Sequence, residues 1–317
     1  MLLSGVGRLS LTAGLIVFLT ACGGQPMITG SPPALQVGTS AVGSSNASPQ
    51  ALLYISSVEN SRPNILIYTY PTGRFKKKVD RSALTFPHGE CADKRGDVYV
   101  TNESSDPSST AIIEYGHGGV QPVRTLTVNG SATQCAVDPT TGDLAVISSR
   151  LAIFRAAHGK PTYYRFPTGF EQTACDYDDK GDLFVNGVTK KAPARAAVIE
   201  LPAKSGTLAK LKLPDISEAK IPGDVRWDGK ALALGDGVNT IFRLEINGTK
   251  AKEVGIVQLY GGADVESIWI ADGDIVGANF LNRSVMIWSY PGGGQPLKVL
   301  TSVGRGDGVA VSPPPRK

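Results

Sequence analysis

Residues 86 to 102 read FPHGECADKRGDVYVTN, and this string recurs in altered form along the rest of the chain. Its other copies are ATQCAVDPTTGDLAVIS at 132 to 148, QTACDYDDKGDLFVNG at 172 to 187, IPGDVRWDGKALALGD at 221 to 236, ADVESIWIADGDIVGAN at 263 to 279 and the half copy GDGVAVS at 306 to 312. A repeat of about 40 to 50 residues is typical of β-propeller blades. The sequence therefore predicts an all-β fold, a six-bladed β-propeller over residues 51 to 312.

Each repeat contains four short strand signals, which we letter a to d. A Gly-containing turn separates strand a from strand b, for example Lys94-Arg95-Gly96-Asp97 before the alternating Val98-Tyr99-Val100. Strand c follows in strings such as TAIIEYGHGG from residue 110 and NTIFRLEING from residue 239, and each ends in a second Gly turn before strand d. Four antiparallel strands joined by tight turns are what one propeller blade requires.

The two ends of the repeat region complement one another. The last strand a, Val309-Ala310-Val311, has no strand b after it, and the first strand b, Leu52 to Ser56, has no strand a before it. Pairing these two strands in one blade closes the ring and removes sheet edges that would otherwise invite aggregation. We therefore expect the N-terminal and C-terminal strands to share one blade.

The strings CAVDPTTGDLAV and CADKRGDVYV resemble NHL-type repeats, whose pattern is roughly P-x-G-I-A-V-D-x-x-G-x-V-Y-V. The chain from about residue 51 to residue 312 is also similar to uncharacterised bacterial secreted lipoproteins built on six-bladed rings of this kind. The resemblance implies the propeller fold, and it does not indicate an activity.

The first 22 residues have the pattern of an export signal. Arg8 precedes a short apolar stretch, Leu9 to Leu19, that is too short to span a bilayer. The closing Leu19-Thr20-Ala21-Cys22 resembles the lipobox of bacterial lipoproteins, which implies a thioether-linked diacylglycerol on Cys22, often with a further amide-linked chain such as palmitate. Two or more such chains anchor a protein stably to a membrane.

The lipobox resemblance also sets the expected location. We expect an exported chain that is lipid-anchored to the bacterial membrane and faces the periplasm or the cell surface. Gly23, in place of an Asp after the lipidated residue, favours the outer membrane. Residues 23 to 50 are rich in Gly, Ser and Pro and carry no charge, so we expect a flexible tether, and residues 313 to 317 are expected to form a disordered tail.

The composition suits one large all-β domain. The 37 Gly and 21 Pro fit many short strands joined by tight turns. A formal net charge of +4 is too small to indicate nucleic-acid binding. We therefore expect a monomeric propeller whose partners are the membrane, through Cys22, and an unknown protein, glycan or small ligand, with no nucleic acid among them.

Cys91, Cys135 and Cys175 fall on three consecutive strands a, near the axis of the predicted ring. Three interpretations remain open, of which packing as small core residues is favoured. The others are a disulfide between neighbouring blades, since export leads to an oxidising compartment, and a metal or redox site. Because three is an odd number, at least one thiol stays free even if a pair forms.

Polar side chains occur where the chain enters strand a, at the expected mouth of the central channel. The candidate ligand-binding residues are His88, Glu90, Gln134, Glu171, Asp224 and Asp264, and Asp176 and Glu266 occupy comparable positions. His88 and Glu90 combine a titratable base with a carboxylate. Because Glu90 and Cys91 are adjacent on one strand, only one of them can point into the channel, and we expect it to be Glu90.

Oxygen-rich side chains of this kind suit Ca²⁺ or Mg²⁺. In the related lactonase-type six-bladed enzymes a Glu, an Asn and an Asp converge on a divalent metal at the axis. This sequence does not match the ordered motifs of that family, so we expect no cofactor, although a divalent cation at the channel mouth stays open and its ligands unknown. The repeated Asp93, Asp138 and Asp178 are expected to cap turns instead.

Two functions are compatible with these features. The first is a membrane-tethered extracytoplasmic binding or scaffold propeller, whose ligand lies on the face built by the b–c connections and the starts of strands a. The second is a lactonase- or lyase-like hydrolytic enzyme with its site at the channel mouth. An enzyme needs several convergent polar side chains at the axis with few apolar ones among them, whereas a binding module tolerates a plugged axis. No catalytic residue is identified.

Overall fold

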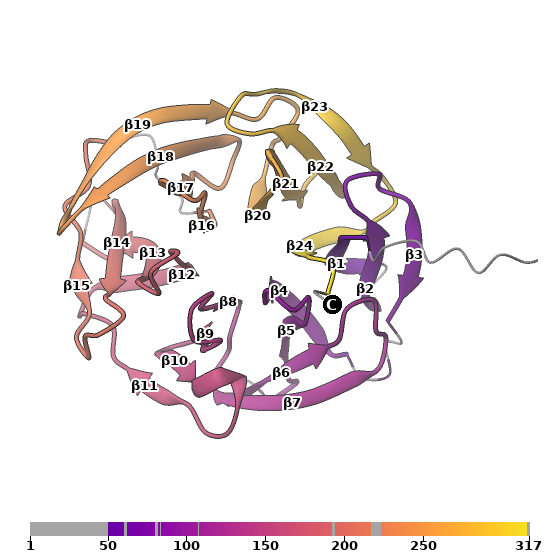
Figure 1. The fold of residues 1–317 in the computed structure, drawn as a ribbon, viewed down its shortest axis with the longest axis horizontal. Helices are drawn as coiled ribbons and strands as arrows, with labels where there is room; N and C mark the ends of the chain where they lie inside the picture. Colours follow the sequence, from indigo (N-terminus) through magenta and orange to yellow (C-terminus); the bar gives the residue numbers. More distant parts are fainter. Residues whose placement is uncertain are drawn as a thin grey trace, which may run out of the picture. The chain divides into compact units, whose positions relative to one another are not determined.

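The computed structural model describes residues 50–59, 62–79, 82, 84–106, 108–191, 194–216 and 223–315. They form six four-stranded antiparallel sheets arranged around a central axis (Figure 1). The predicted six-bladed β-propeller is therefore confirmed. Cys22 and the expected tether lie outside the described residues. Within the described part, no helix has the length and apolar character needed to cross a membrane.

One strand of each blade lies next to the axis (Figure 1). We number the blades 1 to 6 in the order in which these strands surround the axis, starting from the blade that contains both ends of the ring. In that order the innermost strands are β24 (Arg305–Ser312), β4 (Phe86–Ala92), β8 (Gln134–Val137), β12 (Phe170–Tyr177), β16 (Val225–Trp227) and β20 (Val265–Ala271).

The remaining strands of each blade follow outward from the axis to the rim. The second strands are β1 (Leu52–Glu59), β5 (Val98–Glu103), β9 (Leu144–Ile147), β13 (Leu183–Thr189), β17 (Leu232–Gly235) and β21 (Asp274–Asn279). The third strands are β2 (Arg62–Thr69), β6 (Ser109–Tyr115), β10 (Leu151–Phe154), β14 (Ala196–Leu201), β18 (Thr240–Asn247) and β22 (Ser284–Ser289). The rim strands are β3 (Phe75–Lys78), β7 (Pro122–Asn129), β11 (Thr162–Tyr164), β15 (Ala209–Lys210), β19 (Lys250–Gln258) and β23 (Gly293–Leu300).

The ring closes as expected, because the last strand of the chain joins the first. β24 is the innermost strand of blade 1 and pairs antiparallel with β1, from Leu52 opposite Ser312 to Val58 opposite Arg305. The C-terminal strand therefore supplies hydrogen bonds to a strand more than two hundred residues earlier. No innermost strand of the six sheets in the described part is left without a second strand.

In blades 2, 3 and 4 an Asp side chain caps the turn between the first two strands. Asp93 accepts hydrogen bonds from the backbone N–H groups of Arg95 (2.8 Å) and Asp97 (2.9 Å), and Asp178 does the same for Lys180 (2.8 Å) and Asp182 (2.9 Å). The predicted turn-capping role of the repeated Asp residues is confirmed. The Gly of each turn, such as Gly96 at φ +92°, takes a backbone conformation that side chains with a Cβ disfavour.

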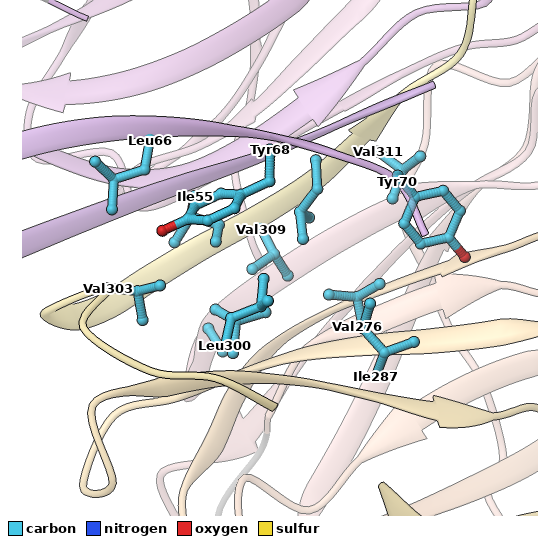
Figure 2. Close-up of a cluster of buried hydrophobic side chains, with 13 residues drawn as sticks. Ile55, Leu66, Tyr68, Tyr70, Val276, Ile287, Leu300, Val303, Val309 and Val311 are labelled. Carbon is cyan, nitrogen blue, oxygen red and sulfur yellow. The ribbon is translucent and has the colours of Figure 1, made fainter. Parts of the chain in front are cut away.

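The hydrophobic core lies between neighbouring blades. Successive residues of a strand point to opposite faces of its sheet, so each blade packs one set of side chains on the blade before it and the other on the blade after it. Figure 2 shows the cluster between blades 6 and 1, where Ile55 and Tyr68 of blade 1 meet Val276 and Ile287 of blade 6. Val309 of the closing strand belongs to the same cluster, so ring closure and core packing depend on each other.

The cysteines divide between two of the three interpretations. Cys91 on β4 and Cys135 on β8 form a disulfide, with their Cα atoms 5.6 Å apart, which joins blades 2 and 3. Cys175 on β12 is free and buried. The favoured expectation of packing is therefore wrong for Cys91 and Cys135, because the innermost strands of adjacent blades bring their Cα atoms within disulfide distance. Packing as a small core residue describes Cys175 alone.

Candidate functional site

Four of the six innermost strands carry a β-bulge near the end where the chain enters the strand. In β24, Gly306 and Gly308 pair with consecutive residues of β1, which leaves Asp307 without a partner. The unpaired residues at the four bulges are Asp307 in β24, His88 and Gly89 in β4, Thr173 in β12 and Glu266 in β20. A bulge bends its strand and redirects a side chain, so these residues leave the regular alternation between the two blade faces.

The redirected side chains line one cavity of about 350 Å³, which we call the axial funnel. All six blades contribute to it, so it lies on the axis. It opens on the face built by the connections between second and third strands and by the starts of the innermost strands, which we call the loop face. The funnel is lined by His88, Thr133, Gln134, Gln172, Thr173, Ala174, Gly237, Glu266, Ser267 and Asp307. Eight of these ten lining residues have a polar side chain.

His88 is held at the funnel by a carboxylate from the neighbouring strand. Its Nε2 lies 3.2 Å from Oε2 of Glu103, and the His88 side chain is 31% exposed. A carboxylate bonded to one ring nitrogen fixes the orientation of the imidazole. The pair therefore presents a positioned, solvent-accessible titratable base beside Asp307.

The funnel also carries two carboxyl groups whose ionisation is disfavoured. The pKa of Glu266 is raised by its desolvation and further by the negative charges of Asp264 and Asp307. Desolvation likewise raises the pKa of Asp307, and His88 and Arg305 oppose that shift. Glu266 and Asp307 therefore create a negative potential on the blade 6 and blade 1 side, which a ligand with a positive charge or hydrogen-bond donors would relieve.

A buried ion pair forms the floor of the funnel. Arg226 donates from Nη2 to Oδ2 of Asp224 at 3.0 Å, and the two side chains are only 3% and 1% exposed. Burial lowers the pKa of Arg226, but Asp224 and Asp176 outweigh that effect and raise it, so the guanidinium stays charged. The Oδ1 atom of Asp176 lies 3.9 Å from Nη1 of Arg226, which makes it the more distant partner.

The floor connects three blades. Oδ2 of Asp224, in blade 5, accepts hydrogen bonds from Nε2 of Gln134 in blade 3 (3.4 Å) and from the backbone N–H of Ile268 in blade 6 (3.0 Å). Arg226 donates from Nε to the carbonyl of Ile268 at 2.8 Å and lies over the ring of Trp269 at 4.7 Å. The hydrogen bond from Gln134 to Asp224 joins two blades that are not neighbours in the ring, and it fixes Gln134 in the wall of the funnel.

The structure separates the six predicted ligand-binding residues. His88 and Gln134 line the funnel, and Asp224 lies beneath it as part of the floor. Glu171 is on the outer surface with a side chain 63% exposed, 3.9 Å from Lys190. Asp264 is not among the residues that line the funnel, and it acts on it only through its charge near Glu266.

The expectation that Glu90 points into the channel is wrong. Glu90 is fully buried and pairs with Val100, whose side chain belongs to the cluster between blades 1 and 2. Burial raises the pKa of Glu90 well above its usual range, and its charge acts on Tyr54 and Tyr115 of the same cluster. Side chains in the regular part of an innermost strand face the adjacent blades, whereas residues at the start of the strand reach the axial funnel.

The sequence pattern missed several residues of the funnel. The repeat places Glu266 at a strand start comparable to those of the predicted candidates, whereas Asp307, in the half copy, and Gln172, before the bulge of β12, are not among them. One signal was present for Asp307, because the pair Asp307-Gly308 matches His88-Gly89 in the first copy. Both pairs form the bulge of their strand.

The possible divalent cation site receives no support from the side-chain geometry. Among the described residues, no three His, Cys, Asp or Glu side chains are grouped so that they could hold a metal ion. Of the predicted candidates, Glu90 and Asp224 are buried away from the funnel space, so they do not form a ligand set with His88. The functions that we propose for the funnel therefore use no metal ion.

Comparison with known proteins supports the propeller fold and does not indicate a ligand or an activity. No protein-family model matches the chain, and no curated protein sequence is significantly similar to it. The structure is similar to a chain in a nidogen–laminin complex (TM-score 0.63, 15% identity, covering 83% of this chain and 98% of that one).

Two further solved structures carry names that suggest enzymes. One is a putative 6-phosphogluconolactonase from Bacteroides fragilis (TM-score 0.55, 12% identity, covering 84% of this chain and 99% of that one). The other is a streptogramin B lyase (TM-score 0.50, 16% identity, covering 69% of this chain and 70% of that one). At these identities the similarities establish the shared propeller fold alone.

Proposed function

We propose that this chain is an exported, lipid-anchored β-propeller that binds a small polar ligand in the axial funnel. The observation that carries the proposal is the set of four bulges, which turn Asp307, His88, Thr173 and Glu266 from four blades toward one cavity. β-Bulges are common next to binding sites, where they redirect side chains toward the ligand. A cavity of about 350 Å³ has the size of a small-molecule site.

The chemistry of the funnel wall indicates the ligand class. Glu266 and Asp307 offer acceptors, Gln134 and Gln172 offer amides, and Ala174 and Gly237 are the only lining residues without a polar side chain. A ligand that fits this wall carries several hydroxyl or amine donors and little apolar surface. We therefore propose an amine-bearing polyhydroxylated molecule, such as an amino sugar.

The cellular setting is supported by the sequence pattern at the N-terminus. The Leu19-Thr20-Ala21-Cys22 box favours a lipid anchor, which leaves the propeller in the periplasm or at the cell surface. A Cys22→Ser chain that keeps the mass and membrane association of the unchanged chain would exclude the anchor. The disulfide between blades 2 and 3 is compatible with an oxidising compartment.

The experiment that tests the funnel is calorimetric titration of the full chain in detergent with glucosamine, with glucose as the uncharged comparison. We expect glucosamine to bind more tightly, and the double variant Glu266→Gln and Asp307→Asn to weaken its binding about tenfold or more, because both charged acceptors are removed. Glu171→Gln removes an exposed carboxylate outside the funnel and serves as the matched control. Equal affinity in the double variant and the control would place the ligand elsewhere.

A second candidate function is acid–base catalysis in the same funnel. The observation that favours it is the His88–Glu103 pair, which holds a titratable base against the cavity. The same preparations separate the two functions when they are incubated with glucono-δ-lactone. Consumption of the lactone that is lost in His88→Asn favours the enzyme, whereas glucosamine binding without lactone consumption favours the binding module.

A further inference from the structure

A second cavity, of about 440 Å³, opens on the loop face between blades 3 and 4. We call it the basic groove. Three chain segments build it: the connection from β9 to β10, the connection from β11 to β12, and the end of β13. Its charged and large side chains are Arg150, Arg165, Lys190, Phe166 and Phe170, and Gln172 lies at its boundary with the axial funnel. The groove and the funnel therefore adjoin, and they share one side chain.

The groove has a charge opposite to that of the funnel. Arg150, Arg165 and Lys190 line it, and no carboxylate does. Arg150 and Arg165 make no ion pair among the described residues, whereas Arg124, Arg226 and Arg243 each pair with a carboxylate. Lys190 has only Glu171, at 3.9 Å and with both side chains mostly exposed, which is a weak interaction. The three cations are thus available to an anionic ligand.

The groove also has a preformed apolar surface. The rings of Phe166 and Phe170 lie 5.7 Å apart with an interplanar angle of 52°, and both side chains are half-buried against the core between blades 3 and 4. The guanidinium of Arg150 is held 4.1 Å from the centre of the Tyr163 ring, which restricts its orientation. Little ordering is therefore required when a ligand binds.

The polar groups around these rings select among possible anions. Guanidinium groups donate two parallel hydrogen bonds to carboxylates and to sulfate or phosphate oxygens. Ser149 and Thr168 supply hydroxyl groups, and Gln172 supplies an amide. Hydroxyl partners beside an aromatic wall fit a sugar ring, which has polar edges and apolar C–H faces. An acyl chain has no polar groups that could form hydrogen bonds with these side chains.

We propose that the basic groove binds the acidic sugar of an anionic polysaccharide. Arg150 and Arg165 bind the carboxylate or sulfate group, and Phe166 and Phe170 pack against the face of the ring. The groove is a second site beside the axial funnel, and ligand binding in the groove does not depend on the ligand proposed for the funnel. Because Gln172 borders both cavities, one extended saccharide chain can continue from the groove toward the funnel.

The test is titration of the full chain with trigalacturonate, with maltotriose as the uncharged comparison. We expect trigalacturonate to bind and maltotriose to bind at least about tenfold more weakly, since the charge is the main anchor. The double variant Arg150→Gln and Arg165→Gln should lose about tenfold or more in affinity for trigalacturonate. The control variant Lys180→Gln and Lys230→Gln removes two exposed cations at turns on the opposite face, and it should bind as the unchanged chain does.

Further arms separate the sugar from other anions. Phe166→Leu keeps every charge, so it should weaken trigalacturonate binding without changing the response to inorganic sulfate. If sulfate competes as well as trigalacturonate and Phe166→Leu has no effect, the groove recognises charge alone and the proposal is overturned. Binding of phosphatidylglycerol vesicles through Arg150 and Arg165, without trigalacturonate binding, overturns it in favour of a lipid surface. Absence of any binding to trigalacturonate also overturns it.

Two readouts keep this test independent of the proposed function. Glucosamine titration of the groove variants reports on the funnel and should be unchanged by them. The melting temperature of each variant reports on folding, and we expect it to stay near that of the unchanged chain because Arg165 is exposed and Arg150 is half-buried. A loss of trigalacturonate binding with both readouts preserved assigns the site to the groove.

Discussion

Glu90 and Cys91 are neighbours on β4, but they contribute to two different blade interfaces. The Glu90 side chain lies between blades 1 and 2, where neither carboxyl oxygen has a hydrogen-bond partner in the described part of the chain. The Cys91 side chain lies between blades 2 and 3, where it is covalently bonded to Cys135. One interface is thus cross-linked, and the other contains a buried acid whose pKa is raised by burial.

The contrast shows how one strand of a repeat serves two unlike environments. Alternation sends adjacent residues to opposite faces, so a single position in the strand decides which interface receives a side chain. The cost of a buried, unpaired carboxyl is limited by protonation, since a neutral acid loses less solvation than a carboxylate. The interface between blades 1 and 2 should therefore depend on pH, whereas the interface between blades 2 and 3 should depend on redox conditions.

The largest effect is expected from removal of the disulfide. The double variant Cys91→Ala and Cys135→Ala should lower the free energy of unfolding by about 2–4 kcal/mol, because the bond closes a loop with a sequence separation of 44 residues. Denaturant unfolding with and without a reducing agent measures this. Cys175→Ala, at the buried free thiol, is the matched control: it keeps the disulfide and should lose stability on reduction as the unchanged chain does, whereas the double variant should not respond. Equal sensitivity of the unchanged chain and the double variant to the reducing agent would contradict the cross-link.

A smaller effect, with a marked pH dependence, is expected from Glu90→Gln. The pKa of Glu90 is raised by burial, so the stability that its neutral form provides is complete below about pH 4.5, its ordinary value, and is lost as the pH rises toward the folded-state pKa. The variant cannot ionise and should be more stable than the unchanged chain by about 1–3 kcal/mol at pH 7, with little difference at pH 4. Thermal unfolding at several pH values measures the difference.

The control for that series is the exposed Glu171→Gln, which should leave the pH profile of stability unchanged. If Glu90→Gln lowers the stability equally at pH 4 and at pH 7, the Glu90 carboxyl has a hydrogen-bond partner in solution. Glu90 would then make an ordinary polar contact in the interface between blades 1 and 2.

The smallest effect is expected from Tyr115→Phe in the same cluster. The Tyr115 hydroxyl is buried and has no hydrogen-bond partner among the described residues, so its removal should change the free energy of unfolding by less than about 1 kcal/mol. Tyr54→Phe is the matched control, because the Tyr54 hydroxyl accepts a hydrogen bond from the backbone N–H of Gly118 at 2.6 Å. We expect that control to cost about 1–3 kcal/mol. Similar losses in both variants would show that Tyr115 is partnered.

Part of the candidate site could be read from the repeat. His88 and Gln134 occupy strand starts, and ring geometry brings such positions together at the axis whatever the details of packing. Asp307 was missed because the regular alternation of a strand gives no sign of a bulge. Glu90 was misplaced because alternation along the strand was expected to run between the channel and the blade, whereas it runs between the two neighbouring blade interfaces.

The sequence by itself determined the number of blades, the order of their strands, the closure of the ring and the Asp-capped turns. Those features depend on local periodicity and on turn residues that recur at a fixed spacing, and they become visible when the copies of the repeat are compared. Only the tertiary structure decided that Cys91 pairs with Cys135, that Asp224 and Arg226 form the floor, and which side chains line the axial funnel. Each of these depends on contacts between blades, where residues far apart in sequence meet at distances that no local pattern encodes.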